Sequence, residues 1–210
     1  MFLVFLQLYT KKAKISQNLT GVITMPTRKD AFNLLKQYNG EALTTHGLAV
    51  ESAMRHFAKK YGENEEKWGI VGLLHDLDYE QFPDEHCYKT QEIMKPLGYS
   101  DEIIRAIMSH AYEMCTDIEP LTRMEKTLYA VDELTGLITA CALVRPSKSV
   151  MDLEVKSVKK KFKQRSFAAG ASREVITEGA AMLDMELGDL IQEVILAMRE
   201  NAPALGLEIK

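Results

Sequence analysis

The sequence predicts an all-α protein, and two observations carry that prediction. Apolar residues recur at spacings of three and four along most of the chain, which is the period of amphipathic helices. Segments that alternate apolar and polar residues, or that concentrate Val, Ile and Thr between turn signals, are scarce. We expect helices over residues 27–38, 42–60, 65–75, 85–96, 100–111, 122–142, 151–166, 172–184 and 187–200.

Residues that interrupt helices set these boundaries. An Asn–Gly pair at 39–40 separates the first helix from the second, and Gly62 ends the second. Ser100 is a candidate N-cap, because two acidic residues follow it in the first turn of the next helix. Pro120 and Pro146 lie on either side of the long sixth helix.

Length and composition indicate one domain of ordinary size with a small appendage: the chain has 210 residues, of which 46% are hydrophobic and 27% charged. A formal net charge of −4 gives no electrostatic reason to expect a nucleic acid or a membrane surface as partner. Cys87, Cys115 and Cys141 are widely spaced and form no C-x-x-C pair, which favours reduced thiols in a cytoplasmic protein. There is no Walker A loop and no G-x-G-x-x-G after a strand.

Residues 1–24 differ from the rest of the chain. Their apolar run is too short to span a bilayer and lacks the basic start and clear cleavage site of a secretory signal. Met25 opens a helical pattern, so we expect 1–24 to be an N-terminal extension that is disordered or stems from a misassigned start codon. The remaining chain is expected to divide into a principal domain over 25–145 and a C-terminal helical extension over 146–210 packed on that domain.

Four residues on successive expected helices suggest a metal site. The apolar run in GIVGLLHDLDYEQF stops on His75 and Asp76, and neighbours on a helix can reach one ion only where the helix ends. His46 stands beside Gly47, whose missing side chain would let another helix or a ligand come close. Asp132 lies within an apolar helix, where an unpaired carboxylate is costly to bury.

Each of these residues also has an ordinary interpretation. A single His in an amphipathic helix is more often a core or surface residue than a ligand, and Asp132 could pair with an Arg or a Lys. The joint pattern H…HD…D is rare by chance. Its imidazole and carboxylate groups suit Zn, Fe, Mn or Ni and are few enough to leave positions open for water.

This pattern resembles the signature of the HD-domain metal-dependent phosphohydrolase superfamily, over roughly residues 27–142. The strings GLLHDLDYE, PDEHCYKT, IMSHAYE and YAVDELTGLI resemble a bacterial and archaeal subgroup of predicted HD hydrolases, and the likeness continues through SVKKKFKQRSFAAG. The resemblance implies an HD-domain helical bundle with additional C-terminal helices. It also implies hydrolysis of phosphoester or related bonds at a metal held by His46, His75, Asp76 and Asp132.

The resemblance raises the question of a second ion. In HD proteins with two metals, two further histidines between the HD pair and the last Asp bind it, and His86 and His110 occupy that interval. Asp76 would then bridge ions about 3.5–4 Å apart, besides orienting the attacking water. The alternative makes His86 and His110 proton donors or supporting residues around one ion. Two matters stay open: whether the centre holds one or two divalent ions, of Mn, Fe, Ni, Zn or Mg, and whether Asp78 and Glu80 support the ligands or belong to a solvated loop.

Basic residues supply candidates for holding a substrate phosphate. These are Arg145 and Lys148, just past the sixth helix, and Lys89. The basic run Glu154–Arg165 is either a solvated helix face or a positive rim that attracts a phosphorylated substrate. His56 is left out of the site, because it lies more than two helical turns beyond the first histidine of the pattern.

We therefore expect a cytoplasmic metal-dependent phosphohydrolase that acts on a nucleotide or a small phosphometabolite. Two alternatives remain open: a dinuclear-iron oxygenase on the same scaffold, and a non-catalytic metal-containing module that binds a ligand or regulates. The expected partner is a small phosphorylated molecule, with no membrane and no specific nucleic acid. A homo-oligomer is compatible with the sequence.

Overall fold

The computed structural model describes residues 25–209, and the expectation for residues 1–24 lies outside that range. Within the described residues there is no strand, only an isolated bridge between Tyr112 and Thr116. Two short 3-10 turns, η2 (Pro83–Glu85) and η3 (Lys95–Leu97), lie on either side of α5 (Tyr88–Met94). The all-α prediction is confirmed. The nine α-helices of the described range are α2 (Arg28–Tyr38), α3 (Glu41–Tyr61), α4 (Glu65–Leu74), α5 (Tyr88–Met94), α6 (Asp101–Ser109), α7 (Arg123–Leu143), α8 (Val155–Phe162), α9 (Arg173–Met182) and α10 (Leu187–Glu200).

Seven of the expected helices agree with these bounds to within two residues at each end. The helix expected over 85–96 is instead broken, because Cys87 has a positive φ of 70° and Pro96 has no N–H to continue the helix beyond α5. The helix expected over 151–166 is shorter. The N–H of Val150 and the hydroxyl of Ser149 both donate to the Leu207 carbonyl, which holds the chain before α8 in a non-helical path.

Capping residues explain where several helices begin and end. The Ser100 side chain accepts a hydrogen bond from the N–H of Ile103, so the expected N-cap of α6 is confirmed. Thr122 forms a capping box with Glu125 at the start of α7. Gly62 ends α3 in the left-handed conformation with φ 71°, which glycine adopts without a steric penalty.

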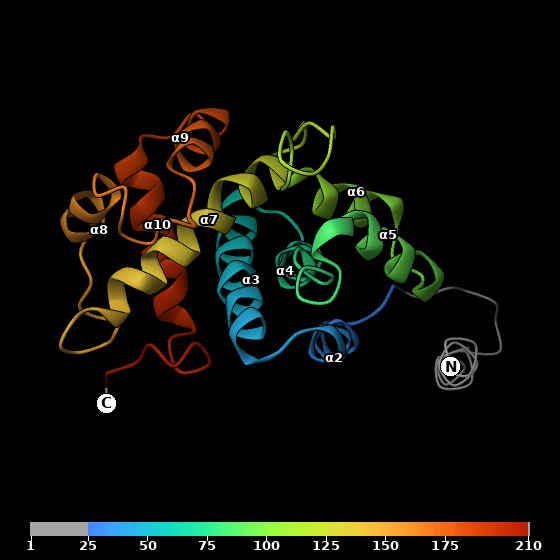
Figure 1. The fold of residues 1–210 in the computed structure, drawn as a ribbon, viewed down its shortest axis with the longest axis horizontal. Helices are drawn as coiled ribbons and strands as arrows, with labels where there is room; N and C mark the ends of the chain where they lie inside the picture. Colours follow the sequence, from blue (N-terminus) through green and yellow to red (C-terminus); the bar gives the residue numbers. More distant parts are fainter. Residues whose placement is uncertain (1–24, 210) are drawn as a thin grey trace.

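Two long helices, α3 and α7, organise the packing. Helix α3 packs against α4, α7 and α10, and α7 also packs against α6, α8 and α9. Figure 1 shows α8, α9 and α10 on one side of the molecule and α2, α4, α5 and α6 on the other, with α3 and α7 between them. The C-terminal helices thus lie against the helices that carry the expected metal ligands, while the domain limits at 145 and 146 stay a prediction.

A close approach between α3 and α4 depends on Gly47. A Cβ atom added there would lie 2.9 Å from the carbonyl oxygen of Leu73 and 3.1 Å from Cδ2 of Leu35. Only glycine permits that backbone separation without a shift of the neighbouring helix. The approach brings His46, beside Gly47, to His75, which follows the end of α4.

None of the helices in residues 25–209 combines the length and the apolar character that a membrane crossing requires.

Candidate metal centre

The structure brings the four residues of the H…HD…D pattern together from α3, the end of α4 and α7. Nε2 of His46 lies 3.2 Å from Nε2 of His75 and 2.9 Å from Oδ1 of Asp132. Nε2 of His75 lies 3.1 Å from Oδ1 of Asp132 and 3.3 Å from Oδ2 of Asp76. His75 is fully buried, whereas the other three side chains are 15–23% exposed, so the cluster is open to solvent on one side.

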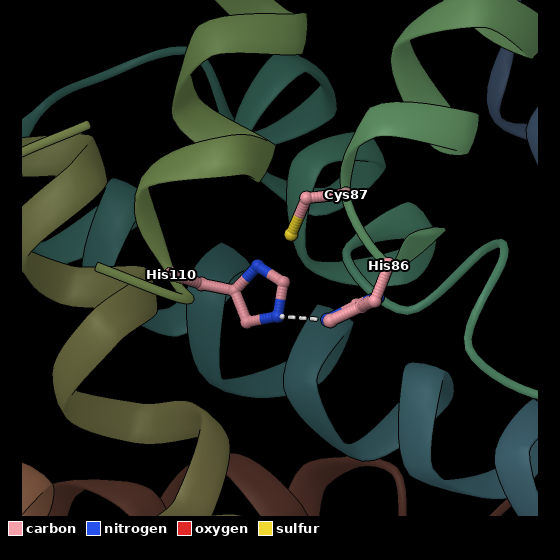
Figure 2. Close-up of side chains that lie close together, drawn as sticks. All are labelled: His86, Cys87 and His110. Carbon is pink, nitrogen blue, oxygen red and sulfur yellow. Dashed lines mark hydrogen bonds between the residues drawn. The ribbon is translucent and has the colours of Figure 1, made fainter. Parts of the chain in front are cut away.

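A second cluster lies on the other side of the Asp76 carboxylate. Nε2 of His86 and Nε2 of His110 are 3.3 Å apart, and each lies 3.5 Å from Oδ1 of Asp76. Figure 2 shows one nitrogen of each of these two imidazoles pointing at the other ring, with the sulfur of Cys87 beside them. The two oxygens of Asp76 therefore face two different pairs of histidines.

Helix ends orient two of these histidines in the same way. His75 is the C-cap of α4 and His110 is the C-cap of α6. Because the last carbonyls of a helix lack intrahelical donors, each imidazole can donate its Nδ1–H to the carbonyl three residues earlier. The distances are 2.8 Å to Gly72 and 2.6 Å to Ile107. Each ring then directs Nε2 toward the centre.

Asp78 orients the third imidazole. It is fully buried, and its Oδ1 accepts from Nδ1 of His86 at 2.7 Å while its Oδ2 accepts from the N–H of Thr90 at 2.7 Å. This carboxylate–histidine contact is typical of the residues that support metal-ligating histidines. Glu80 makes a different contact, because its Oε2 accepts from the N–H of Gly40, the N-cap of α3, at 2.8 Å.

The donor atoms fit divalent metal ions in both clusters. The circle through Nε2 of His86, Nε2 of His110 and Oδ1 of Asp76 has a radius of about 2.0 Å, which matches metal–nitrogen distances of about 2.0–2.1 Å. In the first cluster, four separations of 2.9–3.3 Å are close to the roughly 3.0–3.4 Å between adjacent ligands around such an ion. The fifth, between Nε2 of His46 and Oδ2 of Asp76, is 3.8 Å. With Nδ1 of His86 and of His110 donating elsewhere, both Nε2 atoms, 3.3 Å apart, are acceptors in the neutral rings and can both bind a cation.

The electrostatics of the first cluster also favour a cation. Burial disfavours a charged imidazole, but the carboxylates of Asp76 and Asp132 outweigh it and hold the pKa of His75 well above its usual range. Burial likewise disfavours ionised carboxylates, yet His75 outweighs it, aided by His46 at Asp132 and by His110 at Asp76. The pKa values of Asp76 and Asp132 are lowered as a result. Two ionised carboxylates thus converge on one buried nitrogen.

Two residues near the centre were missed by sequence reasoning. Cys87 is fully buried beside His86 and His110, and burial, together with the Asp78 carboxylate, raises its pKa. Glu133 is half-buried, and burial followed by the charge of Asp132 raises its pKa to about 7. The available signals were the Cys directly after His86 and the second acid directly after Asp132.

The expected phosphate-binding residues lie in other places. Arg145 follows the end of α7 and pairs with Asp152, with Nη2 2.8 Å from Oδ2. Asp132 is 11 residues from the last residue of α7, a helical rise of about 16 Å. Lys148 is exposed on the same loop. Lys89, one residue into α5, pairs with Glu92 at 2.7 Å. Their role in substrate binding stays a prediction.

The basic run lies with Arg145 rather than with the histidines. Lys160 and Lys161 of α8 line, with Arg145, a cavity of about 410 Å³. His56, which the sequence analysis left out of the site, pairs through Nε2 with Oε2 of Glu193 at 2.7 Å and so links α3 to α10.

Comparison with known proteins agrees with this geometry. Residues 43–137 match the model of the HD domain family. Residues 43–137 are an HD domain. The matched residues contain both histidine clusters and Asp132, which are consistent with a metal site.

The HD region is also distantly similar to Ribonuclease Y. The Ribonuclease Y proteins of Thermotoga petrophila and Thermotoga maritima are each 26% identical over 142 residues, which is 65% of this chain and 27% of each relative. The aligned region therefore spans about a quarter of the length of these curated relatives. No solved structure matched the chain.

Proposed function

We propose that this chain is a phosphohydrolase with a two-ion centre that acts on a nucleotide or a small phosphometabolite. His46, His75, Asp132 and Oδ2 of Asp76 would hold one ion, and His86, His110 and Oδ1 of Asp76 the other. The observation that carries the proposal is the placement of Asp76 between two histidine pairs, at 3.3 Å from His75 on one side and 3.5 Å from His86 and His110 on the other.

Bound ions would lower the pKa of a coordinated water toward neutrality and stabilise charge on the phosphoryl oxygens. The chain's own residues prepare that position. The carbonyls of Gly72 and Ile107 and the carboxylate of Asp78 hold three imidazoles with Nε2 directed inward. The partial exposure of His46, Asp76 and Asp132 leaves the side through which a phosphate and a water would enter. Asp76 would orient the attacking water, and His86 and His110 would act through the ion that they hold.

Metal stoichiometry tests the two-ion centre. We expect about two ions per chain in protein prepared without chelator. Asp76→Asn should weaken the binding of both ions. Asp132→Asn should weaken mainly the binding of the first ion, and His110→Gln mainly that of the second. Asp84→Asn, which changes an exposed acid in η2, is the matched control and should retain both. A single ion in the wild type, or equal losses in Asp132→Asn and His110→Gln, would refute the division into two positions.

A substrate panel tests the reaction. We expect phosphate release from a nucleotide or small phosphoester in the presence of one divalent metal, and loss of that release in Asp76→Asn. Because the similar Thermotoga proteins are named as ribonucleases, an RNA oligonucleotide belongs in the panel as a second candidate. Cleavage of RNA alone would replace the small-molecule substrate by a phosphodiester of a polymer.

The same preparation separates the remaining alternatives. Bound iron with a visible absorption band, and oxygen consumption with an organic substrate, would favour an oxygenase. Binding of a phosphorylated ligand without product under Mn, Fe, Ni, Zn or Mg would favour a non-catalytic module. Either result would overturn the hydrolase proposal.

A further inference from the structure

Cys87 lies directly at the second cluster. Its sulfur and one nitrogen each of His86 and His110 lie within 4.8 Å of one another, and all three residues are buried. Figure 2 shows the sulfur of Cys87 pointing toward the two imidazoles rather than into the surrounding helices. A buried cysteine often serves only as a small apolar side chain, but this one faces ring nitrogens.

The independent sign that a ligand belongs here comes from the histidines. His86 and His110 are 6% and 3% exposed. Their Nδ1 atoms donate to Asp78 and to the Ile107 carbonyl, so in the neutral rings both Nε2 atoms, 3.3 Å apart, are acceptors. Two buried ring nitrogens so close together are an arrangement that a cation would stabilise, and Figure 2 shows the sulfur of Cys87 beside the same two rings.

The backbone at Cys87 has a conformation that is unusual for a residue other than glycine. Its φ of 70° and ψ of −45° lie outside the regions that residues with a Cβ normally adopt, and it is the N-cap of α5. Glycine would adopt this conformation with less strain. The chain nevertheless carries a thiol here.

We propose that Cys87 supplies a thiolate ligand to the ion held by His86, His110 and Asp76. The inference rests on the two-ion centre of the proposed function. Coordination exchanges the thiol proton for the ion, and the proton passes to solvent, so no oxidant or reductant is needed. Adjacent nitrogen and sulfur ligands of zinc lie about 3.6 Å apart. The sulfur lies within 4.8 Å of one nitrogen of each imidazole, so it would move closer to the rings when it binds the ion.

This ligand would make the two ion positions chemically different. The first position offers two imidazoles and two carboxylates, whereas the second offers two imidazoles, one thiolate and one shared carboxylate. Thiolate favours Zn²⁺, Co²⁺ and Fe²⁺ over Mg²⁺ and Mn²⁺. The second position should therefore select the softer ions, while the first accepts harder ones.

Cobalt spectroscopy of the full chain tests the thiolate directly. Metal-free protein is titrated with Co²⁺, whose visible ligand-field bands count bound ions and whose near-ultraviolet charge-transfer band reports a sulfur ligand. We expect two equivalents to bind and the charge-transfer band to grow with only one of them. In Cys87→Ser the band should disappear, and the affinity for that equivalent should fall about tenfold or more.

Matched variants keep the result interpretable. Cys141→Ser changes a buried cysteine of α7 that lines the separate cavity with Arg145, and it should retain the charge-transfer band. Cys87→Ala tests the same loss without a new hydroxyl, and circular dichroism checks that each variant is folded. In both Cys87 variants, the second position should lose its preference for Zn²⁺ over Mg²⁺, as a competition titration of the two ions can measure.

The outcomes separate this inference from the proposed function. Two equivalents of Co²⁺ without a charge-transfer band, or a band that persists in Cys87→Ser, would overturn the thiolate ligand and leave the two-ion centre intact. Binding of only one equivalent would overturn the two-ion centre and the thiolate ligand with it.

Discussion

Replacing Gly47 by alanine tests whether the close approach of α3 and α4 builds the metal centre. The new Cβ would lie 2.9 Å from the Leu73 carbonyl oxygen, against about 3.4 Å for an ordinary contact, so the backbone two residues before His75 must move by about 0.5 Å. Overpacking of this kind costs about 1–3 kcal/mol, and alanine in a helix interior returns about 1 kcal/mol. The expected net loss is about 0–2 kcal/mol, near 1 kcal/mol.

Thermal unfolding and metal titration measure the two consequences. A loss near 1 kcal/mol lowers the Tm of a domain of this size by about 2–4 °C. Because metal ligands must be held to within about 0.5 Å, the affinity for the ion at His46 and His75 should also fall, by about tenfold.

Gly136→Ala is the matched control for Gly47→Ala. Gly136 lies within α7, and a Cβ atom added there meets no atom within 4 Å. Alanine should therefore stabilise the protein by about 0.5–1 kcal/mol and raise the Tm, with metal binding unchanged. If Gly47→Ala raised the Tm as Gly136→Ala does and bound metal like the wild type, the proposed role of the α3–α4 contact would be refuted.

Three further predictions concern the supporting residues and the ions. Asp78→Ala should lower the affinity for the ion at His86 by about 10–100-fold and leave the affinity for the other ion unchanged, as isothermal titration can measure. An equal loss of affinity at both positions would contradict the assigned contact. Burial raises the pKa of Glu125, but hydrogen bonds from the Thr122 backbone and Arg105 outweigh it and leave the pKa lowered, so its stabilisation is present above about pH 4.3 and lost as pH falls through the folded pKa. Urea unfolding of Glu125→Gln should therefore show a deficit of about 1–2 kcal/mol at pH 7 that shrinks toward pH 3, and a deficit independent of pH would exclude this carboxylate as its source. Chelation of bound metal should lower the Tm, because ions at 1,000 times their Kd stabilise the folded state by about 4 kcal/mol, and an unchanged Tm would speak against tight binding.

Most helices could be predicted from the sequence because helix formation depends on local residue order. The three- and four-residue spacing of apolar side chains, the N-cap Ser100 and the left-handed Gly62 act over one or two turns. Of the two failures, the broken helix over 85–96 has a local cause at Cys87 and Pro96, whereas the shorter helix over 151–166 has a non-local one. The chain before α8 is held by hydrogen bonds to the Leu207 carbonyl, which is more than 50 residues away in the sequence. No local pattern marks that contact.

The candidate site divides in the same way. Residue chemistry and order pointed to the histidines and aspartates of the pattern, since few other groups bind divalent ions with positions left for water. Spacing alone could not tell a carboxylate that orients a metal-binding histidine from one that does not. Asp78 accepts a hydrogen bond from His86, while Glu80, two residues later, accepts one from the N–H of Gly40 at the start of α3. Only the path of the chain after α4 gives the two carboxylates these different contacts.

What the sequence by itself determined is the all-helical fold and the set of groups able to hold a metal. The tertiary structure alone decided how those groups are arranged relative to one another. Contacts such as His46–His75 and His46–Asp132 join residues 29 and 86 positions apart, and their distances follow from how α3, α4 and α7 pack. The same packing turns the two oxygens of Asp76 toward different histidine pairs and brings Cys87 to one of them. Arg145 lies instead beyond the far end of α7, because a straight helix carries it away from Asp132.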